Sequence, residues 1–207
     1  MLSVRNCSLF RNGEPLLMDI SFDVAPGKIA TLMGPSGAGK STFLNWMIGD
    51  LAPEFNAQGT LLLNQRSLTS LPVERRRIGI LFQDALLFPH LNVGQNLRMA
   101  VPASVVGRSQ RQHVVAEALE SAGLANYERR DPATLSGGER ARISVLRALL
   151  AEPEALLLDE PFSRLDLPLR QSFREFVWQK TNQLGLPVVM VTHDEQDIPP
   201  GGQVIRL

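Results

Sequence analysis

The sequence predicts an α/β fold in which an open sheet of parallel strands alternates with helices. A glycine-rich loop at residues 34–42 joins an apolar run, 29–33, to a helical pattern. Two later runs, 155–158 and 187–191, are apolar throughout, as strands buried on both faces of a parallel sheet are, and Thr192 ends the second strand. Polar residues follow these strands, and ligands of open α/β sheets bind at this carboxyl edge. We therefore expect a ligand site where the loop and the strand ends meet.

The composition indicates one domain with no nucleic-acid partner. The chain has 207 residues, 44% of them hydrophobic, which is enough for one core with a small inserted subdomain. Lys and Arg number 21, as do Asp and Glu, so no net basic field would attract nucleic acid. The single cysteine, Cys7, fits a reducing, cytoplasmic compartment, and we expect it to be a small strand residue. No apolar run approaches the roughly 20 residues of a membrane span.

The chain begins with the pattern of a β-hairpin. Residues 2–10 and 16–24 alternate apolar and polar side chains around turn residues at 11–14. Phe10 ends the first of these strands. Its ring could cover a purine by stacking or fill the hairpin core, and periodicity alone favours the core.

Two strand patterns, 59–63 and 78–82, follow the loop helix, which is expected at 42–48. The basic triplet 75–77 lies between them, and we expect a solvated turn without a catalytic role. From residue 93 to about 150 the strand signals disappear, which indicates an inserted helical subdomain at about 86–150.

That inserted block contains one strongly marked helix. Residues 109–112 have capping-box form, and Gly123 stops the helical pattern. One helical face is apolar, and it consists of Val114, Val115, Ala118, Leu119 and Ala122. After the strand at 155–158 we expect a helix at 171–184, and the chain ends in a short strand at 204–207.

The glycine-rich loop matches the phosphate-binding pattern GxxxxGK[ST]. Its residues are Gly34, Pro35, Ser36, Gly37, Ala38, Gly39, Lys40, Ser41 and Thr42. The glycines let backbone N–H groups point into one concavity, and the start of the following helix adds partial positive charge. Lys40 supplies a mobile charge for the outer phosphates, and the Ser41 hydroxyl is placed to hold Mg²⁺. The pattern arises by chance in on the order of one chain in a hundred, so nucleotide binding is expected rather than an empty turn.

Three polar residues follow the buried strands. Asp159 lies where a carboxylate can hold waters around a magnesium ion that Ser41 also binds. The adjacent Glu160 could accept the proton of a water that attacks the γ-phosphate. His193 follows the next strand and would face the same phosphate. A solvated corner and a structural histidine are the alternatives, and the phosphate loop upstream favours the catalytic interpretation.

Residues 135–139, LSGGE, form a second informative segment. Ser136 and Glu139 have capping-box spacing before a helix expected at 140–150. A cap alone does not require two glycines. Gly137 and Gly138 allow the backbone to lie against a ligand, so this helix start is a candidate second anion site.

In this order the motifs resemble those of the ATP-binding subunit of ABC transporters, over essentially the whole chain. The matching segments are the Walker A loop 34–42, the Q-loop Gln83, the signature 135–139, the Walker B segment 156–160, the D-loop 163–166 and the switch His193. The resemblance implies a P-loop NTPase core of RecA type, with an N-terminal antiparallel β subdomain and an inserted α-helical subdomain, in one ATPase domain over residues 1–207. It also implies a head-to-tail dimer, in which the signature of one copy completes the site on the other copy.

The resemblance assigns roles to the motif residues. Lys40 and the loop amides would hold the β- and γ-phosphates, and Ser41, Asp159 and Gln83 would serve the Mg²⁺, with Gln83 also sensing the attacking water. Glu160 would be the base. His193 would fix the γ-phosphate, and Ser136, with Gly137 and Gly138, would contact it from the opposite copy. Phe10 would stack on adenine, where the family usually has tyrosine.

The resemblance also implies a membrane partner. Residues 87–93 are similar to the segment that touches a coupling helix of the membrane subunit in bacterial importers, although internal packing would explain an apolar segment there equally well. We therefore expect an ATPase subunit of an importer that works as a homodimer with integral membrane permease subunits on the cytoplasmic side of the cell membrane. The alternatives are a soluble mechanical ATPase of the same type and a P-loop kinase, which leaves LSGGE and His193 unexplained.

Three features depart from the family pattern. Glu139 replaces the usual signature glutamine, and its carboxylate could weaken the attraction of that site for phosphate. Arg164 replaces a small residue in the D-loop, which could alter communication across the dimer. The segment after His193 is short, and no C-terminal regulatory domain is expected.

Overall fold

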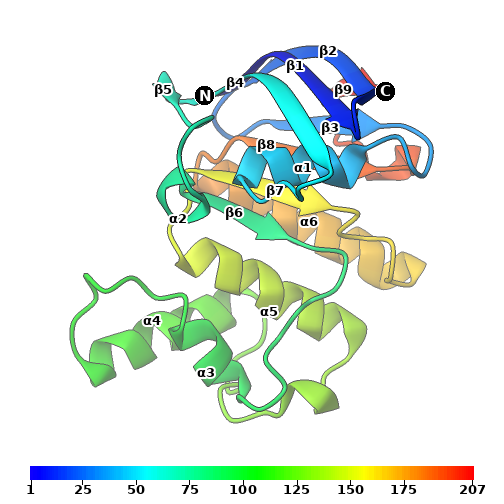
Figure 1. Cartoon of the computed structure of the whole chain (residues 1–207). Helices are drawn as coiled ribbons and strands as arrows, with labels where there is room; N and C mark the ends of the chain where they lie inside the picture. The colour runs from blue at the N-terminus through cyan, green and yellow to red at the C-terminus, as the bar shows by residue number, and fades with distance from the viewer. The chain divides into compact units, whose positions relative to one another are not determined.

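The computed structural model describes all 207 residues and divides into two compact units (Figure 1). The first, which we call the sheet unit, comprises Met1–Ile80, Glu154–Glu160 and Trp178–Leu207. The second, which we call the helical unit, comprises Leu81–Pro153 and Pro161–Val177. Each unit is described below by itself.

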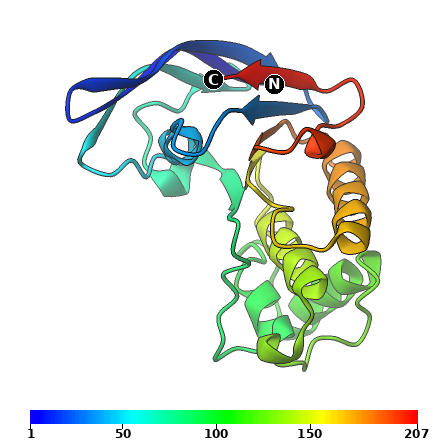
Figure 2. The same ribbon diagram turned by 90° about the vertical axis from the view of Figure 1, so that its right-hand side faces the viewer.

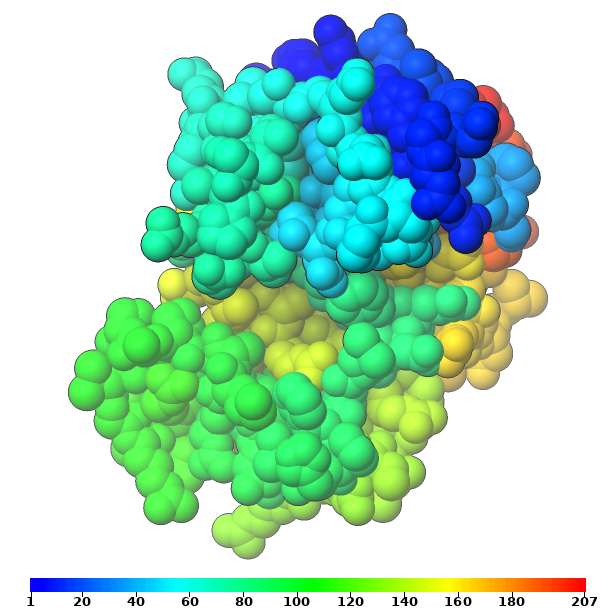
Figure 3. Space-filling view, viewed as in Figure 1, coloured from blue at the N-terminus to red at the C-terminus, as the bar shows by residue number.

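An antiparallel sheet opens the sheet unit. Its strands are β1 (Leu2–Arg11), β2 (Glu14–Val24), β4 (Phe55–Leu63) and β5 (Arg66–Ser67), in the spatial order β2-β1-β4-β5. The predicted N-terminal hairpin is confirmed, since β1 pairs antiparallel with β2. β1 also pairs with β4, and Figure 3 shows the two strands, in blue and cyan, adjoining at the surface. Cys7 is fully buried in β1, as expected for a small strand residue.

A second sheet of five strands supplies the carboxyl edge that the sequence predicts. Its strands are β3 (Ile29–Met33), β6 (Ile78–Leu81), β7 (Ala155–Asp159), β8 (Val188–Thr192) and β9 (Gln203–Arg206), in the order β6-β7-β8-β3-β9. β3 pairs in parallel with β8 and β9, and β7 pairs in parallel with β8. The predicted strands 59–63 and 78–82 therefore belong to different sheets.

Helix α1 (Lys40–Ile48) joins the two sheets into one core. One hydrophobic cluster contains side chains of β1, β2 and β4 together with those of β3, β7 and β8, and α1 contributes five members. Phe43 and Leu44 of α1 are fully buried, and the Phe43 ring lies 6.1 Å from that of Phe22. Figure 2 shows α1 directly beneath the antiparallel strands. The start of this helix, which carries the phosphate loop, is fixed by that packing.

The basic triplet 75–77 corrects a prediction. Arg76 ends the short helix α2 (Val73–Arg76) and is 6% exposed, so it is not part of a solvated turn. Its guanidinium donates to the carbonyl oxygens of Trp46 and Met47 at 2.8 and 3.0 Å. It also donates to those of Thr69 and Leu71, at 3.0 and 2.8 Å. The bonds to Trp46 and Met47 reach carbonyl oxygens in the last turn of α1, where a helix lacks its full set of backbone partners, so Arg76 anchors the end of α1.

The helical unit contains α3 (Val93–Arg98), α4 (Arg108–Ser121), α5 (Gly137–Leu150) and the 3₁₀ turn η1 (Pro132–Thr134). Helix α6 (Leu167–Gln183) begins in this unit, and its last residues belong to the sheet unit. The short 3₁₀ turn η2 (Glu195–Asp197) follows β8. The capping box predicted at residues 109–112 is wrong, because α4 starts after Gly107 without a side-chain cap. Val115 and Leu119 of α4 are buried, as its apolar face predicts.

Candidate active site

The phosphate loop connects β3 to α1 in the sheet unit. All five residues of β3 are buried, so the strand fixes where the loop begins. Gly37 and Gly39 both have φ of 84°, a left-handed conformation that costs glycine little. Space excludes a side chain at Gly39 as well, since a Cβ there would lie 2.9 Å from the Cγ atom of Leu16. The backbone of the loop can therefore approach an anion closely.

Lys40 is folded back over its own loop. Its side chain is buried, and its ammonium donates to the carbonyl oxygens of Gly34 and Pro35, at 2.7 and 2.9 Å. These bonds hold a positive charge beside the loop amides and the N-terminus of α1. All three features attract phosphate.

Ser41 and Asp159 meet although 118 residues separate them in the chain. The Ser41 hydroxyl donates to Asp159 Oδ1 at 3.2 Å. Burial raises the pKa of Asp159, the bond from Ser41 opposes this, and the neighbouring charge of Glu160 adds to the rise. A hydroxyl and a carboxylate are oxygen ligands of the kind that Mg²⁺ takes. No group of three or more His, Cys, Asp or Glu residues surrounds a metal position, so such an ion would need phosphate oxygens and waters as its other ligands.

Glu160 and His193 form the next pair along the edge. His193 Nδ1 lies 3.2 Å from Glu160 Oε1, and the Glu160 side chain is 21% exposed. The Glu160 backbone has φ of 44°, which is uncommon outside glycine. Its N–H donates to the carbonyl oxygen of Val191 in β8, at 3.0 Å. Backbone strain of this kind clusters at functional sites, and here it turns the chain directly after a buried strand.

Phe10 lies at the end of β1, where it pairs with Pro15 of β2 and Asn56 of β4. The ring is partly exposed and does not belong to the buried core cluster of the sheet unit. The periodicity argument for core packing is therefore wrong. The partly exposed ring lies near the end of the hairpin strand β1.

The Q-loop and D-loop residues contact each other in the helical unit. Gln83 Nε2 donates to the Ser163 hydroxyl at 3.1 Å, and Arg164 forms an ion pair with Asp84. Arg164, the unusual D-loop residue, is thus bound to the Q-loop of its own chain. Sequence reasoning did not anticipate the role of Asp84, because nothing local marks its distant partner. A cavity of about 560 Å³ lies beside these loops and is lined by residues of 81–89, 132–144 and 161–165.

The signature segment begins α5 with the predicted capping box. The Ser136 N–H donates to Glu139 Oε2 at 2.7 Å, and the Glu139 N–H donates to Ser136 Oγ at 3.3 Å. Gly137 and Gly138 form the first turn, where a Cβ on Gly138 would lie 3.2 Å from Leu169. Tyr127, which sequence reasoning missed, donates its hydroxyl to Glu139 Oε1 at 2.6 Å.

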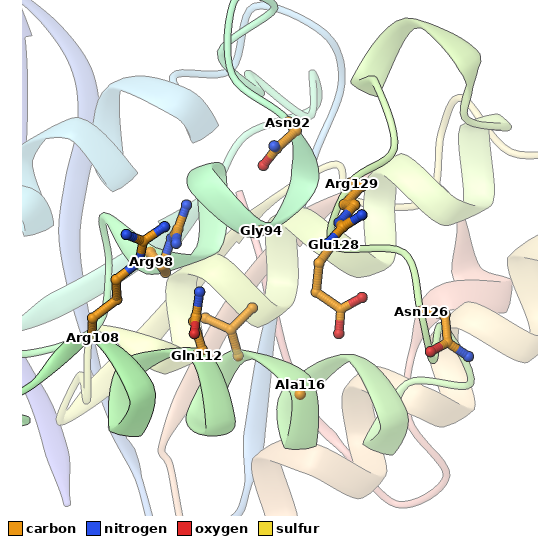
Figure 4. A pocket seen from close by; sticks show the side chains of 10 residues that line it. Asn92, Gly94, Arg98, Arg108, Gln112, Ala116, Asn126, Glu128 and Arg129 are labelled. Carbon is orange, nitrogen blue, oxygen red and sulfur yellow. The ribbon is translucent and has the colours of Figure 1, made fainter.

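A second cavity lies elsewhere in the helical unit. It has a volume of about 660 Å³ and lies between α3, α4 and the segment after α4 (Figure 4). Its lining includes Arg98, Arg108, Gln112 and Glu128, whose polar groups Figure 4 shows around one hollow. None of the expected site residues lines it.

The comparisons with known proteins identify the family. A family model described as ABC transporter matches residues 17–163. The chain belongs to the ABC transporter family. It is 54% identical over 207 residues to the "Uncharacterized ABC transporter ATP-binding protein YnjD" of Escherichia coli (strain K12), covering 100% of this chain and 95% of that protein. As an ABC ATP-binding chain it hydrolyses ATP.

Other relatives are more distant. The "Spermidine/putrescine import ATP-binding protein PotA" of Mycoplasma mycoides subsp. mycoides SC is 34% identical over 197 residues. The alignment covers 95% of this chain and 55% of PotA, so the chain spans about half the length of that relative. PotA of Mycoplasma capricolum subsp. capricolum gives the same identity and coverage.

A solved structure confirms the predicted P-loop NTPase fold. The structure titled "Dimeric structure of a post-hydrolysis state of the ATP-binding cassette MJ0796 bound to ADP and Pi" matches with a TM-score of 0.81 and 27% identity. The match covers 100% of this chain and 94% of that chain. None of the helices of this ABC protein has the length and apolar character to cross a membrane.

Proposed function

We propose that this ABC ATPase powers solute import through a membrane permease, as a homodimeric subunit bound to the cytoplasmic face of the membrane. Residues 1–207 form one ATPase domain, with the inserted helical subdomain at about 86–150. The observation that carries the proposal is the row of polar pairs at the carboxyl edge of the parallel sheet. There Ser41 contacts Asp159, and His193 contacts Glu160.

In the proposed mechanism, different residues of the site bind the phosphates, the adenine and the metal ion. The loop amides and Lys40 hold the β- and γ-phosphates of ATP, and the partly exposed ring of Phe10 stacks on adenine. Ser41 and Asp159 would hold Mg²⁺, which would supply positive charge to offset that of the phosphate oxygens. The family resemblance assigns Gln83 to the metal and to the attacking water.

Glu160 is the base in this scheme. Its carboxylate accepts the proton of the attacking water, which general-base catalysis requires. The 3.2 Å contact with His193 Nδ1 restrains the Glu160 carboxylate, and His193 also meets the γ-phosphate. Removing the Glu160 carboxylate leaves the phosphate loop intact. A substitution of Glu160 should therefore reduce ATP turnover while ATP binding is kept.

The second half-site comes from the other copy in the dimer. Ser136 Oγ accepts the N–H of Glu139, which leaves the hydroxyl hydrogen of Ser136 free to donate to the γ-phosphate of the partner copy. Gly137 and Gly138 let the start of α5 approach that phosphate. The dimeric neighbour with bound ADP and Pi supports this arrangement.

The Q-loop segment is the proposed contact with the permease. Leu86 and Phe88 are 56% and 40% exposed beside the 560 Å³ cavity, which favours docking over internal packing. The backbone around Phe88 is held by Asn96, which accepts the Phe88 N–H at 2.9 Å and donates to the Phe88 carbonyl oxygen at 3.1 Å. A fixed loop that exposes apolar side chains suits a coupling helix. The similarity of residues 87–93 to importer ATPases and the relation to PotA support import.

Purification of the tagged chain from detergent-solubilised membranes of its host tests this proposal. We expect a membrane subunit with several spans to co-purify, and the double substitution Leu86→Ser and Phe88→Ser to release it while ATP binding persists. Measurement of substrate uptake into proteoliposomes then establishes the direction of transport. Recovery of soluble partners alone, from a preparation that still binds ATP, would contradict the transporter assignment.

A further inference from the structure

Tyr127 connects the loop after α4 to the signature helix α5. Its hydroxyl donates to Glu139 Oε1 at 2.6 Å, while Glu139 Oε2 accepts the Ser136 N–H at 2.7 Å. Both carboxylate oxygens of Glu139 are therefore engaged within the helical unit. These two hydrogen bonds restrict rotation of the Glu139 carboxylate at the start of α5.

The phenol is itself held from two sides. The guanidinium of Arg130 lies over the Tyr127 ring at 3.8 Å from its centroid. The loop that carries both residues is bound to the start of α3, since the Gly94 N–H donates to the Glu128 carbonyl oxygen at 2.8 Å and the Val93 N–H to that of Arg130 at 3.0 Å. Tyr127 thus approaches Glu139 from a fixed backbone.

The charges of this cluster respond to one another. The hydrogen bond from Tyr127 is the largest cause that lowers the pKa of Glu139, followed by the bond from the Ser136 backbone. The same bond is the largest cause that raises the pKa of Tyr127. Arg130 is the other charged group that faces the pair, and it favours the ionised form of both. Glu139 is consequently a charged carboxylate at neutral pH.

A charged carboxylate in the signature raises a physical problem. The start of α5 is the proposed contact for the triphosphate of the partner copy, and a mobile negative charge there would repel it. The anchored carboxylate instead accepts hydrogen bonds from the Ser136 N–H and the Tyr127 O–H, which offset part of its negative charge.

We infer that Tyr127 is a positioning residue of the signature, which anchors the Glu139 carboxylate so that Ser136 can receive the partner's ATP despite the negative charge. This inference rests on the proposed dimeric function. It assigns a role to a residue outside every ATPase motif. It also explains how the signature can carry the charged Glu139 at the position where the family usually has an uncharged glutamine.

The first test needs no nucleotide. Tyr127 is the only tyrosine of the chain, so the ultraviolet absorbance of phenolate reports its ionisation alone. We expect wild-type Tyr127 to titrate above the ordinary value of about 10 and E139Q to lower that pKa toward it. Circular dichroism at each pH verifies that the chain stays folded. Identical titrations of wild type and E139Q would overturn the inference.

The second test measures ATP hydrolysis by the full chain. Y127F removes only the hydroxyl. We expect roughly a tenfold rise in KM for ATP with kcat nearly unchanged, close to the low end of the range for hydrogen bonds to charged groups. In an E139Q background, Y127F should leave KM almost unchanged, because no charge remains to anchor. Ser121→Ala, which removes another hydroxyl of the helical unit, serves as the control and should match wild type.

The pH dependence separates positioning from a merely structural effect. Without the hydroxyl of Tyr127, the pKa of Glu139 returns toward its ordinary value of about 4.3, so the ratio of the Y127F KM to the wild-type KM should fall as pH is lowered from about 6 to about 4. A structural defect would persist at low pH and in the E139Q background, and that result would overturn the inference. If the tyrosine titration behaves as expected while Ser136→Ala leaves turnover intact, the failure lies in the proposed contact of the signature with ATP.

Discussion

Replacing Arg76 should destabilise the sheet unit strongly although Arg76 belongs to none of the nucleotide motifs. The guanidinium makes four hydrogen bonds of 2.8 to 3.0 Å to carbonyl oxygens, two of them in the last turn of α1. Hydrogen bonds to charged groups contribute about 1.5–3 kcal/mol each, and burying a guanidinium costs several kcal/mol. The difference predicts that Arg76→Met lowers the free energy of unfolding by about 3–5 kcal/mol.

Urea denaturation followed by circular dichroism measures this loss. Arg75→Met is the matched control, because Arg75 is the exposed neighbour in the same helix, and its effect should stay within about 0.5 kcal/mol. Arg76→Lys should recover only part of the loss, since an ammonium lacks the planar fork that reaches several carbonyls. A loss below about 1 kcal/mol for Arg76→Met would refute the argument that these carbonyls depend on Arg76.

Three further predictions concern the site and the core. Glu160→Gln should bind ATP with unchanged affinity but lose roughly 10²–10⁴-fold in turnover, because the base is removed and the phosphate loop kept; equal turnover would remove Glu160 from that role. Burial raises the pKa of Asp159 above its unfolded value. The free energy of unfolding therefore decreases as pH rises from the unfolded pKa through the folded pKa, because the folded state disfavours the ionised carboxylate. Asp159→Asn should therefore raise the urea midpoint at neutral pH while it weakens Mg²⁺-dependent hydrolysis, and a lower midpoint would contradict this. Burial raises the pKa of Cys7 to about 12, so alkylation by iodoacetamide near neutral pH should be slow until urea unfolds the chain, as mass spectrometry can verify.

Local signals predicted the elements well. The strand at 29–33, the hairpin and the strand at 188–192 lie where apolar pattern and turn residues indicate them. The capping box at Ser136 is correct because both of its partners lie within one turn of the same helix. The capping box at residues 109–112 is wrong because the N-cap of α4 is Gly107, two residues before Ser109. Arg111 in the first turn of α4 donates to carbonyl oxygens around the end of α3.

By itself the sequence determined the phosphate loop, the order of the strands along the chain and the polar residues that follow them, since each depends on neighbours a few residues away. Only the tertiary structure decided which side chains meet. It buried Arg76 against the end of α1, bound Arg164 to Asp84, and placed Tyr127 on Glu139. Such contacts depend on how distant backbone segments pack. The residues next to an arginine or a tyrosine in the sequence do not indicate which distant group its side chain will contact in the folded protein.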